Sequence, residues 1–454
     1  MSGRLGVIVD RRPHRWVLAM LQELHLAGVS TCVSSKAVRG RSLDLRASFR
    51  RSDDPVRGWH LEIGTERGGI PAFQETVDGA DAVRVRLIAI AGDGARVVRS
   101  GRFPYARSHA RTMELIARQA ARWIEQEQEK QSTDSGCTSV PMPPAADPNV
   151  LERSLFIVAG VVRFVRWGVR YLFEEARWDV AVTSASIDTF LADPKNVWLH
   201  WLARSTSEFL ADPFVAGHGD GRARVLCETV DAGVPSVVAI DLDDRFGSRK
   251  PMIASEDPTS YPYVFAVDDE TWLLPEQHAR RSLYAYRLNG KVEAIEEPIF
   301  HGIAAVDSTI VRHDGRWWLF CGDADDAPNY ALRIYWANHP SGPWTPHARN
   351  PAKIDIAGSR PAGTFFVLDG TLYRPAQDCT GRYGRAVVVQ RVEVLTPDDF
   401  QETPVARIDA CSVQRAGAVG VHTLSHGEGW IAIDAQFRRW SLRKPFRLLR
   451  GTLA

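Results

Sequence analysis

The sequence predicts a chain of more than one domain, with an α/β domain at the N-terminus and an all-β domain of repeated hairpins after it. Three observations support this class. The chain has 454 residues, more than one ordinary domain needs. Its start shows a strand-helix-strand pattern, and a hairpin motif recurs roughly every 50 residues in the second half. The 14 tryptophans suit both β-sheet packing and sugar-stacking surfaces.

The composition excludes several classes of function. Lysine and arginine total 56 against 55 acidic residues, so net charge gives no argument for a nucleic-acid partner. The six cysteines are scattered without a CxxC pair, which argues against a zinc knuckle or a disulfide framework. We find no signal peptide and no apolar run of membrane-spanning length. These features predict a cytoplasmic protein. No cofactor and no metal-ligand residues are predicted, and whether a metal ion is bound stays open.

The N-terminal domain begins with a buried strand at residues 4–10, an apolar helical pattern at 16–26 and a second strand at 29–34. This order is typical of an α/β layer. There is no GxGxxG after the first strand, so a dinucleotide site is not supported. The remaining predicted elements are two strands, at 82–90 and 97–103, and an amphipathic helix, at 112–126.

The opening strand, the segment Gly68-Gly69-Ile70-Pro71 and the strand pair after it resemble a shortened formyltransferase domain of the kind that uses tetrahydrofolate. His60 lies near the position of that family's catalytic histidine. The family's Asn-x-His and its catalytic Asp have no counterpart here. The resemblance therefore implies a degenerate, non-catalytic domain over residues 1–125, and it disfavours the alternative of a sugar formyltransferase-related protein.

Residues 126–150 are charged and then rich in Ser, Thr and Pro, as expected of a linker. Residues 151–195 are expected to form an amphipathic helix and a connecting strand. The helical pattern places four arginines among Leu, Ile, Val, Phe and Trp. Such a helix can contact an anionic membrane surface or pack on its own domain. Packing is the favoured interpretation, because core-facing amphipathic helices are far commoner.

From residue 196 to 454 we count five copies of one hairpin. The clearest copy starts at Asp307, turns at Asp314-Gly315 and ends at Asp323. An all-β pattern of this period, with polar groups at fixed strand ends, predicts a five-bladed β-propeller.

In such a fold the residues that open the first strands converge at one end of the central channel. These residues are Asp212, Tyr261, Asp307, Arg360 and His422. A second set, at the ends of the partner strands, comprises Glu228, Glu276, Asp323, Gln377, Asp378 and Asp434. Carboxylates around an Arg and a His can bind a polyhydroxylated ligand and divide acid and base roles. The alternative is that they only accept hydrogen bonds from neighbouring backbone.

The segments Asp307-Ser-Thr-Ile-Val, Ser341-Gly-Pro-Trp, Ser359-Arg-Pro-Ala-Gly and Leu372-Tyr-Arg-Pro-Ala resemble the N-terminal domain associated with plant glucosamine inositolphosphorylceramide transferases. The resemblance covers roughly residues 178–440. In the plant proteins the glycosyltransferase domain is a separate C-terminal one. The resemblance therefore implies a role in a polysaccharide or glycolipid pathway and does not itself imply transferase activity.

More distantly, the repeats are similar to the arabinanase and β-xylosidase hydrolases. That similarity implies Asp212 as the general base and Asp307 as the supporting carboxylate, with His422 at the position of a central histidine. Arg360 stands where those enzymes have their general acid. The acid would have to come from Glu276, Glu228 or Asp378. Arginine at this position favours an anionic ligand, because its planar fork binds carboxylate or phosphate groups.

The sequence thus predicts a glycan-active enzyme, of the hydrolase type, for an anionic or amino-sugar-containing glycoconjugate. The alternative is a non-catalytic carbohydrate-binding propeller. The expected partner is a carbohydrate or sugar phosphate, and the oligomeric state stays open. The catalytic candidates are Asp212, Asp307 and Glu276, and the substrate-binding candidates are Arg360, His422, Glu228, Tyr261, Asp323, Gln377 and Asp378.

Overall fold

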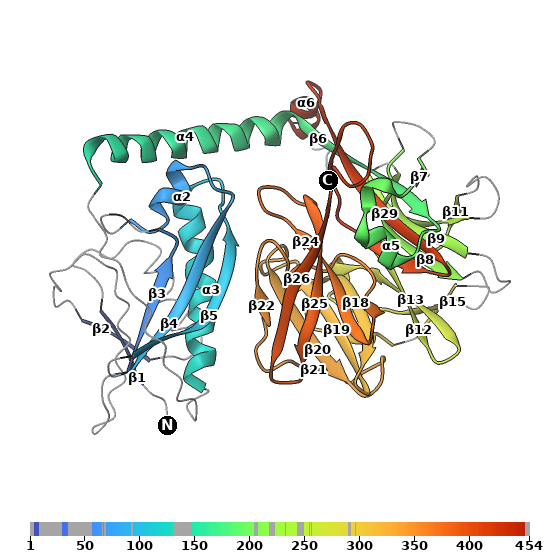
Figure 1. Cartoon of the computed structure of the whole chain (residues 1–454), viewed down its shortest axis with the longest axis horizontal. Helices are drawn as coiled ribbons and strands as arrows, with labels where there is room; N and C mark the ends of the chain where they lie inside the picture. Colours follow the sequence, from blue (N-terminus) through green and yellow to red (C-terminus); the bar gives the residue numbers. More distant parts are fainter. Residues whose placement is uncertain are drawn as a thin grey trace. The chain divides into compact units, whose positions relative to one another are not determined.

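The computed structural model contains two compact units, Met1–Arg170 and Tyr171–Ala454 (Figure 1). The residues that it describes are 4–8, 30–34, 57–65, 67, 70–91, 94–129, 148–203, 208–217, 223–231, 233–242, 249–253, 255, 257–288, 292–295 and 297–449. The predicted helix at 16–26, the Gly68-Gly69 pair and the side chain of His60 lie outside this set. The formyltransferase-like domain therefore stays a prediction.

The first unit is built on two sheets and the helix α3. Its elements before residue 130 are β1 (Arg4–Ile8), β2 (Ser30–Ser34), β3 (Arg57–Ile63), α2 (Phe73–Val77), β4 (Ala82–Ala91), β5 (Gly94–Pro104) and α3 (His109–Glu129). Strands β1 and β2 pair in parallel, as a strand-helix-strand opening requires. Strands β3, β4 and β5 form an antiparallel sheet.

Helix α3 packs one face against its own unit. Ile116, Ala120 and Trp123, spaced by three to four residues, are all buried. The Trp123 ring meets the Phe103 ring of β5 edge-on, with the ring centroids 5.6 Å apart. The two strands and the helix predicted between residues 82 and 126 are confirmed.

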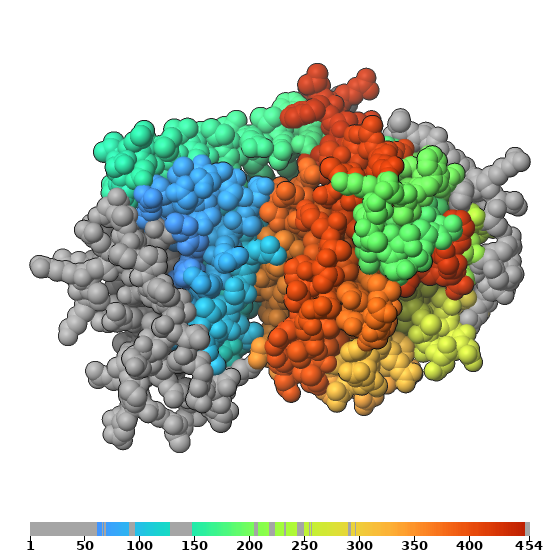
Figure 2. Space-filling model, viewed as in Figure 1, coloured from blue at the N-terminus to red at the C-terminus, as the bar shows by residue number. Residues whose placement is uncertain are grey.

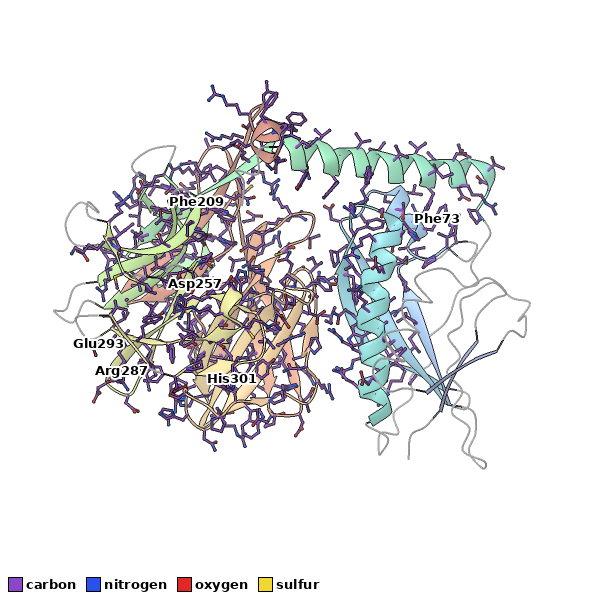
Figure 3. All side chains as sticks on the ribbon, turned by 180° about the vertical axis from the view of Figure 1, so that it is seen from behind. Phe73, Phe209, Asp257, Arg287, Glu293 and His301 are labelled. Carbon is purple, nitrogen blue, oxygen red and sulfur yellow. The ribbon has the colours of Figure 1, made fainter. Side chains whose placement is uncertain are left out.

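Helix α4 (Val150–Phe173) confirms the predicted amphipathic helix and begins at a capping box. The Glu152 N–H donates to Asn149 Oδ1 at 2.9 Å, and the Asn149 N–H donates to Glu152 Oε2 at 2.9 Å. Phe156 stacks on Phe73, which Figure 3 labels beneath the helix. The helix thus packs on its own unit, as expected, and Figure 2 shows its outer side uncovered in that view. Among the described helices, none combines the length and apolarity needed to cross a bilayer.

The second unit is mostly β, as predicted. Besides one two-stranded sheet, its described residues form five antiparallel sheets of four or five strands. The first is formed by β8 (Ala211–Gly217), β9 (Ala223–Asp231), β10 (Val234–Asp241) and β11 (Lys250–Pro251). The second is formed by β12 (Ser260–Val267), β13 (Glu270–Glu276), β15 (Tyr286–Leu288) and β16 (Val292–Ala294). The third is formed by β18 (Ala305–His313), β19 (Arg316–Asp323), β20 (Ala331–Ala337), β21 (Thr345–Pro346) and β22 (Lys353–Ile354).

The fourth sheet is formed by β23 (Phe366–Leu368), β24 (Thr371–Asp378), β25 (Ala386–Leu395) and β26 (Phe400–Asp409). The fifth is formed by β6 (Glu174–Thr183), β7 (His200–Trp201), β27 (Ala418–Gly420), β28 (Leu424–Gly427) and β29 (Trp430–Trp440). The smaller elements are α5 (Ile187–Ala192), η1 (Pro194–Asn196), η2 (His278–Arg280), β14 (Ser282–Leu283), β17 (Phe300–His301) and α6 (Lys444–Leu449).

The hairpin β18–β19 illustrates how the local sequence determines each repeat. Asp314 and Gly315 both have positive φ, 48° and 75°, which is the backbone of a two-residue turn that matches strand twist. His313 and Arg316 pair directly across that turn. The predicted hairpin is therefore confirmed in position and in register.

The fifth sheet joins the two ends of the second unit. Strand β6 pairs with β29 along ten residues, from Thr183 opposite Ile431 to Glu174 opposite Trp440. Trp178, Val180 and Val182 of β6 are buried. The predicted start of the β domain at residue 196 leaves this strand out, because β6 has no hairpin partner next to it in the sequence.

Contacts between neighbouring sheets run in a closed circuit. The Phe214 and Tyr261 rings join the first and second sheets, and the Tyr263 hydroxyl donates to the Ile310 carbonyl of the third. Arg360, which leads into the fourth sheet, binds Asp307 of the third. A bridge between Gly363 and Leu424 joins the fourth and fifth sheets. Asp434 of the fifth accepts the N–H of Asp212 of the first, which completes the circuit.

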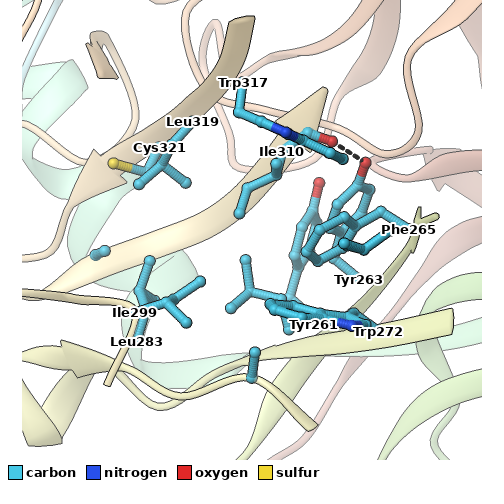
Figure 4. Packing of buried hydrophobic residues seen from close by; sticks show 14 of the residues in the cluster. Tyr261, Tyr263, Phe265, Trp272, Leu283, Ile299, Ile310, Trp317, Leu319 and Cys321 are labelled. Atoms are coloured by element: carbon cyan, nitrogen blue, oxygen red, sulfur yellow. Dashed lines mark hydrogen bonds between the residues drawn. The ribbon is translucent and has the colours of Figure 1, made fainter. Parts of the chain in front are cut away.

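Aromatic side chains fill the space between the second and third sheets (Figure 4). Tyr263 stacks on Phe265, and Phe265 meets both Trp272 and Trp317 edge-on. Trp318 lies on the opposite face of β19 and belongs to another cluster. These tryptophans are packing residues, so the high tryptophan content partly reflects the core and not only a surface for sugars.

Candidate functional site

The backbone at the start of three first strands is bent in the same way. Asp212, Tyr261 and Asp307 have left-handed φ angles of 49°, 41° and 49°. Each sits at a register shift in its hairpin. A left-handed residue other than glycine costs roughly 1–2 kcal/mol. Such strain concentrates at functional sites, and here it recurs in three successive sheets at the position predicted from the sequence.

Asp212 contacts side chains from the first and fifth sheets. Its Oδ1 accepts a hydrogen bond from Thr423 Oγ1 at 2.7 Å and lies 3.3 Å from His422 Nε2. Its carboxyl group is also hydrogen-bonded to Glu228. The N–H of Asp212 donates to Asp434 Oδ2 at 3.1 Å. The structure therefore brings together three predicted site residues, Asp212, His422 and Glu228, from the first and fifth sheets.

The carboxyl groups of Asp212 and Glu228 are hydrogen-bonded to each other, and each shifts the pKa of the other. Burial raises the pKa of Glu228 well above its usual range, and the charge of Asp212 raises it further. Burial also raises the pKa of Asp212, although the nearby His422 acts in the opposite direction. Two carboxylates in contact cannot both ionise easily. Glu228 is therefore the proton donor to Asp212.

His422 lies between two carboxylates. Its Nδ1 is 2.6 Å from Asp434 Oδ2, and its ring stacks on Trp178 of β6 with the ring centroids 3.8 Å apart. Burial opposes the charged form of the ring, but Asp434 and Asp212 outweigh this effect and the pKa of His422 is raised. The raised pKa favours the protonated imidazole, whose charge offsets part of the negative charge of Asp434 and Asp212.

Asp307 and Arg360 form a two-point ion pair. Arg360 Nε donates to Asp307 Oδ2 at 2.5 Å, and Nη2 donates to Oδ1 at 3.0 Å. Gln377 Nε2 also donates to Asp307, and Asn329 accepts from Arg360 Nη1. Burial raises the pKa of Asp307 to about 7 against the opposing charge of Arg360. Arg360 lies over the Tyr383 ring as well.

These contacts bear on the expectation that Arg360 holds an anionic group of the ligand. Its guanidinium already forms a fork with Asp307 and a third bond with Asn329. A ligand phosphate or carboxylate would have to displace these groups. The arginine therefore acts first on the protein's own carboxylate, which sequence reasoning missed because Asp307 and Arg360 come from different repeats.

Glu276 is placed unfavourably for the role of proton donor. Its Oε2 accepts the N–H of Asp307 at 2.9 Å, and its Oε1 lies 2.8 Å from His278 Nδ1. Burial opposes its ionisation, but the contact with His278 and the charge of Arg360 outweigh burial and lower the pKa of Glu276. The group is thus held as a carboxylate that ties the second sheet to the third.

The remaining predicted residues have structural or local partners. The Tyr261 hydroxyl accepts the Gly363 N–H at 2.8 Å and lies 3.2 Å from Thr309 Oγ1, so it ties sheets together. Asp323 Oδ1 accepts the backbone N–H of Asp325. Asp378 binds Arg407 and the N–H of Thr380. None of these three contacts Asp212 in the interactions given above. Four further predicted residues form a separate group: Asp307, Arg360, Gln377 and Glu276. No hydrogen bond or ion pair described above joins this group to Asp212.

Two important residues were not among the predicted catalytic or binding candidates. Asp434 accepts N–H groups of Asp212, His422 and Thr423 and so organises the cluster. The one sequence feature that pointed to Asp434 was its position at the end of the fifth partner strand. No sequence feature pointed to Trp178, because it belongs to a strand outside the predicted repeats.

The cluster around Asp212 could hold a divalent cation. Within the described residues, Asp212, His422 and Asp434 offer ligand atoms within 4.8 Å of one another. Imidazole and carboxylate donors suit ions such as Zn²⁺. A ligand histidine must be neutral, so His422 would have to lose its proton to the ion.

Comparison with solved structures finds glycoside hydrolases of low similarity. One is a thermostable family-43 glycoside hydrolase, with 14% identity, a TM-score of 0.36, and coverage of 44% of this chain and 76% of that one. Another is the catalytic domain of a GH62 α-L-arabinofuranosidase from Coprinopsis cinerea, with 15% identity, a TM-score of 0.37, and coverage of 50% and 90%. No conclusion below rests on these likenesses.

Curated relatives are more similar in sequence. Glucosamine inositolphosphorylceramide transferase 1 of Oryza sativa subsp. japonica is 33% identical over 245 residues, which are 50% of this chain and 33% of that protein. The Arabidopsis thaliana protein of the same name is 33% identical over 220 residues, 44% of this chain and 27% of that protein. This chain thus spans about a third of the length of these relatives.

The family model described as "Glucosamine inositolphosphorylceramide transferase 1, N-terminal" matches residues 202–433. This range contains Asp212, Asp307, Arg360 and His422, and it covers just over half of the chain. The protein therefore belongs to the family of glucosamine inositolphosphorylceramide transferase 1 N-terminal domains.

Proposed function

We propose that the second unit acts on the sugar part of a glycoconjugate and that its five sheets are the blades of one β-propeller. Membership of the family supports the first part, because the name of the plant relatives pairs glucosamine with inositolphosphorylceramide. The closed circuit of contacts between the sheets supports the second. The cluster around Asp212 is the site of action in this proposal.

Asp212 is the general base in the proposed reaction, and Asp307 is the supporting carboxylate. The observation that carries this assignment is the environment of Asp212: a buried carboxylate on a strained backbone, contacted by Thr423, His422 and Glu228. Burial raises the pKa of Asp212 and so strengthens it as a base once it has lost its proton. Asp307, paired with Arg360, is buried near enough for the charge of Asp212 to raise the pKa of Asp307.

A second candidate is a non-catalytic glycan-binding unit. Glycoside hydrolysis uses two carboxyl groups that stand about 5 to 9.5 Å apart across the bond. Here Glu228, the protonated carboxyl, is hydrogen-bonded directly to Asp212, and Glu276 is tied to the backbone of Asp307. This arrangement favours binding, or a reaction that needs a base without a separate carboxylic acid.

The variant Asp212→Asn separates the two candidates. Binding of amino sugars, sugar phosphates and glycolipids is measured by calorimetry, and turnover by transfer or release of labelled sugar. If Asp212 is the base, the variant binds as before but loses at least about 10²-fold in turnover. If the natural protein binds a sugar and never turns it over, the binding candidate holds.

Asp369→Asn is the matched control. Asp369 has the same left-handed φ of 49° but lies in an exposed turn, so the same chemical change should alter neither binding nor turnover. Failure of the natural protein to bind any of these compounds would overturn the proposed function.

A further inference from the structure

Helix α4 uses one face to pack on the first unit. Phe156 stacks on Phe73 with the ring centroids 5.1 Å apart. Arg163 donates to the Ala80 carbonyl at 2.6 Å and lies over the Tyr105 ring. Glu152, also on this side, binds Arg67 at 2.5 Å. Residues 152, 156 and 163 fall on one face at the helical repeat, so this side of the helix is occupied.

The opposite face is apolar and exposed over its whole length. Its central side chains expose between 41% and 68% of their surface: Leu151, Val158, Val161, Val162, Val165 and Val169. At about 100° per residue these six positions lie within an arc of about 100°. Further exposed apolar side chains widen the stripe to roughly half of the helix circumference: Leu155, Ile157 and Phe164. Figure 3 shows side chains along the helix projecting away from the side where Phe73 lies. An apolar surface of this length normally marks an interaction site.

The charges of the helix are arranged around this stripe. Glu152 is its only acidic residue, and it lies on the packed face. At about 100° per residue, Arg153 falls at one edge of the stripe and Arg166 at the other. The exposed face therefore carries positive charge along its borders and no negative charge.

Residues 171–173, the last turn of α4, belong to the second unit. Within that unit they contact a C-terminal segment that is also apolar and basic, residues 440–447. The Trp440 ring lies 6.5 Å from the Phe173 ring, and Lys444 Nζ lies 5.7 Å from the centroid of the Tyr171 ring. Trp440, Leu442 and Phe446 expose 65%, 79% and 65% of their surface. Aromatic residues next to basic ones are typical of the boundary between a membrane and water.

We propose that α4 docks this protein on an anionic lipid surface. The helix lies in the plane of the membrane, with the apolar stripe at the boundary of the acyl chains and with Arg153 and Arg166 on the lipid headgroups. A second copy of the chain fits the stripe less well. Pairing two identical arginine-bordered stripes about a two-fold axis brings like charges together, and the exposed face has no carboxylate to separate them.

The test is co-sedimentation of the whole protein with vesicles. Phosphatidylcholine vesicles with and without phosphatidylglycerol serve as probes. We expect binding to the vesicles that contain phosphatidylglycerol, and little binding to phosphatidylcholine alone. The double variant V158E/V161E should abolish binding, because it puts two charges at the centre of the stripe. Replacing Arg153 or Arg166 with Gln should each weaken binding roughly fivefold, and added salt should have a similar effect.

The matched control is V367E/V405E, which makes the same change at two valines of the second unit that expose 60% and 48%. It should bind like the natural protein. Equal binding by V158E/V161E, or equal binding to vesicles without anionic lipid, would overturn the proposal. A third outcome would also overturn the proposal. In it, the natural protein does not bind vesicles, and light scattering shows that it is a dimer which V158E/V161E converts to a monomer.

Discussion

Asp212, Tyr261 and Asp307 have the same backbone at the same place in three hairpins, yet their side chains do different things. Asp212 is hydrogen-bonded to Glu228 and lies beside His422, and burial or neighbouring charge raises the pKa of all three groups. Tyr261 reaches across to Gly363 and Thr309. Asp307 holds Arg360. The three positions therefore share a backbone conformation, but the type of residue determines whether the side chain belongs to the candidate site or links neighbouring sheets.

Tyr261→Phe tests the structural role of that residue. The change leaves the Gly363 N–H without an acceptor in a buried place, which costs about 1–3 kcal/mol of the free energy of unfolding. Chemical denaturation should show this loss, with sugar binding unchanged. Tyr373→Phe, on a partly exposed side chain, should leave stability nearly unaltered. A weakened sugar affinity at unchanged stability would instead support the predicted substrate-binding role of Tyr261.

At the scale of elements, two kinds of joint hold the second unit together. Within a sheet, tight turns such as Asp314-Gly315 set the pairing of neighbouring strands. Between sheets, aromatic packing, polar side chains and close backbone approaches make the contact. The closest approach described is at Gly363, where an added Cβ would lie 1.8 Å from the Leu424 carbonyl oxygen.

Gly363→Ala should therefore destabilise the second unit strongly. The methyl group would collide with backbone of the fifth sheet, and φ at this position is 124°. We expect a loss of roughly 3 kcal/mol or more, seen as a lower urea midpoint. Gly370→Ala is the matched control: φ is also positive, but no atom lies within 4 Å of the added Cβ. It should cost only about 1–2 kcal/mol, and equal losses in both variants would contradict the close-approach explanation.

At the scale of the molecule, the second unit is closed by segments more than 200 residues apart. Strand β6, which directly follows α4, pairs with β29 along its full length. The same closure brings Trp178 onto His422 and Asp434 onto Asp212. The site near Asp212 therefore depends on a strand that precedes all five predicted repeats.

This closure predicts different behaviour for two fragments. A fragment of residues 171–454 should unfold cooperatively on heating, since it keeps β6 and its ten paired residues. A fragment of residues 196–454, the predicted β domain, should not, because β29 loses a paired neighbour and Trp178, Val180 and Val182 no longer fill the core. Circular dichroism and calorimetry can compare them. Cooperative unfolding of the shorter fragment would show that β6 is dispensable.

Part of the candidate site could be predicted from the sequence. The positions of Asp212, Asp307 and His422 at the starts of strands follow from the hairpin repeat, and the structure places Asp212 and His422 in one cluster. The pairing of Arg360 with Asp307 and the central place of Asp434 could not be read in this way. They depend on which sheet lies beside which, and no spacing in the sequence records that.

The sequence alone determined the hairpins, the amphipathic helix α4 and the family, because turns, strand alternation and helical periodicity depend on residues close together in the chain. Only the tertiary structure decided which strand closes the fifth sheet, which carboxyl groups have raised or lowered pKa values, and which face of α4 stays uncovered. These properties depend on burial and on pairs of residues far apart in sequence. Burial and neighbouring charges shift a pKa only when the groups lie close together, and these groups come close only in the folded chain.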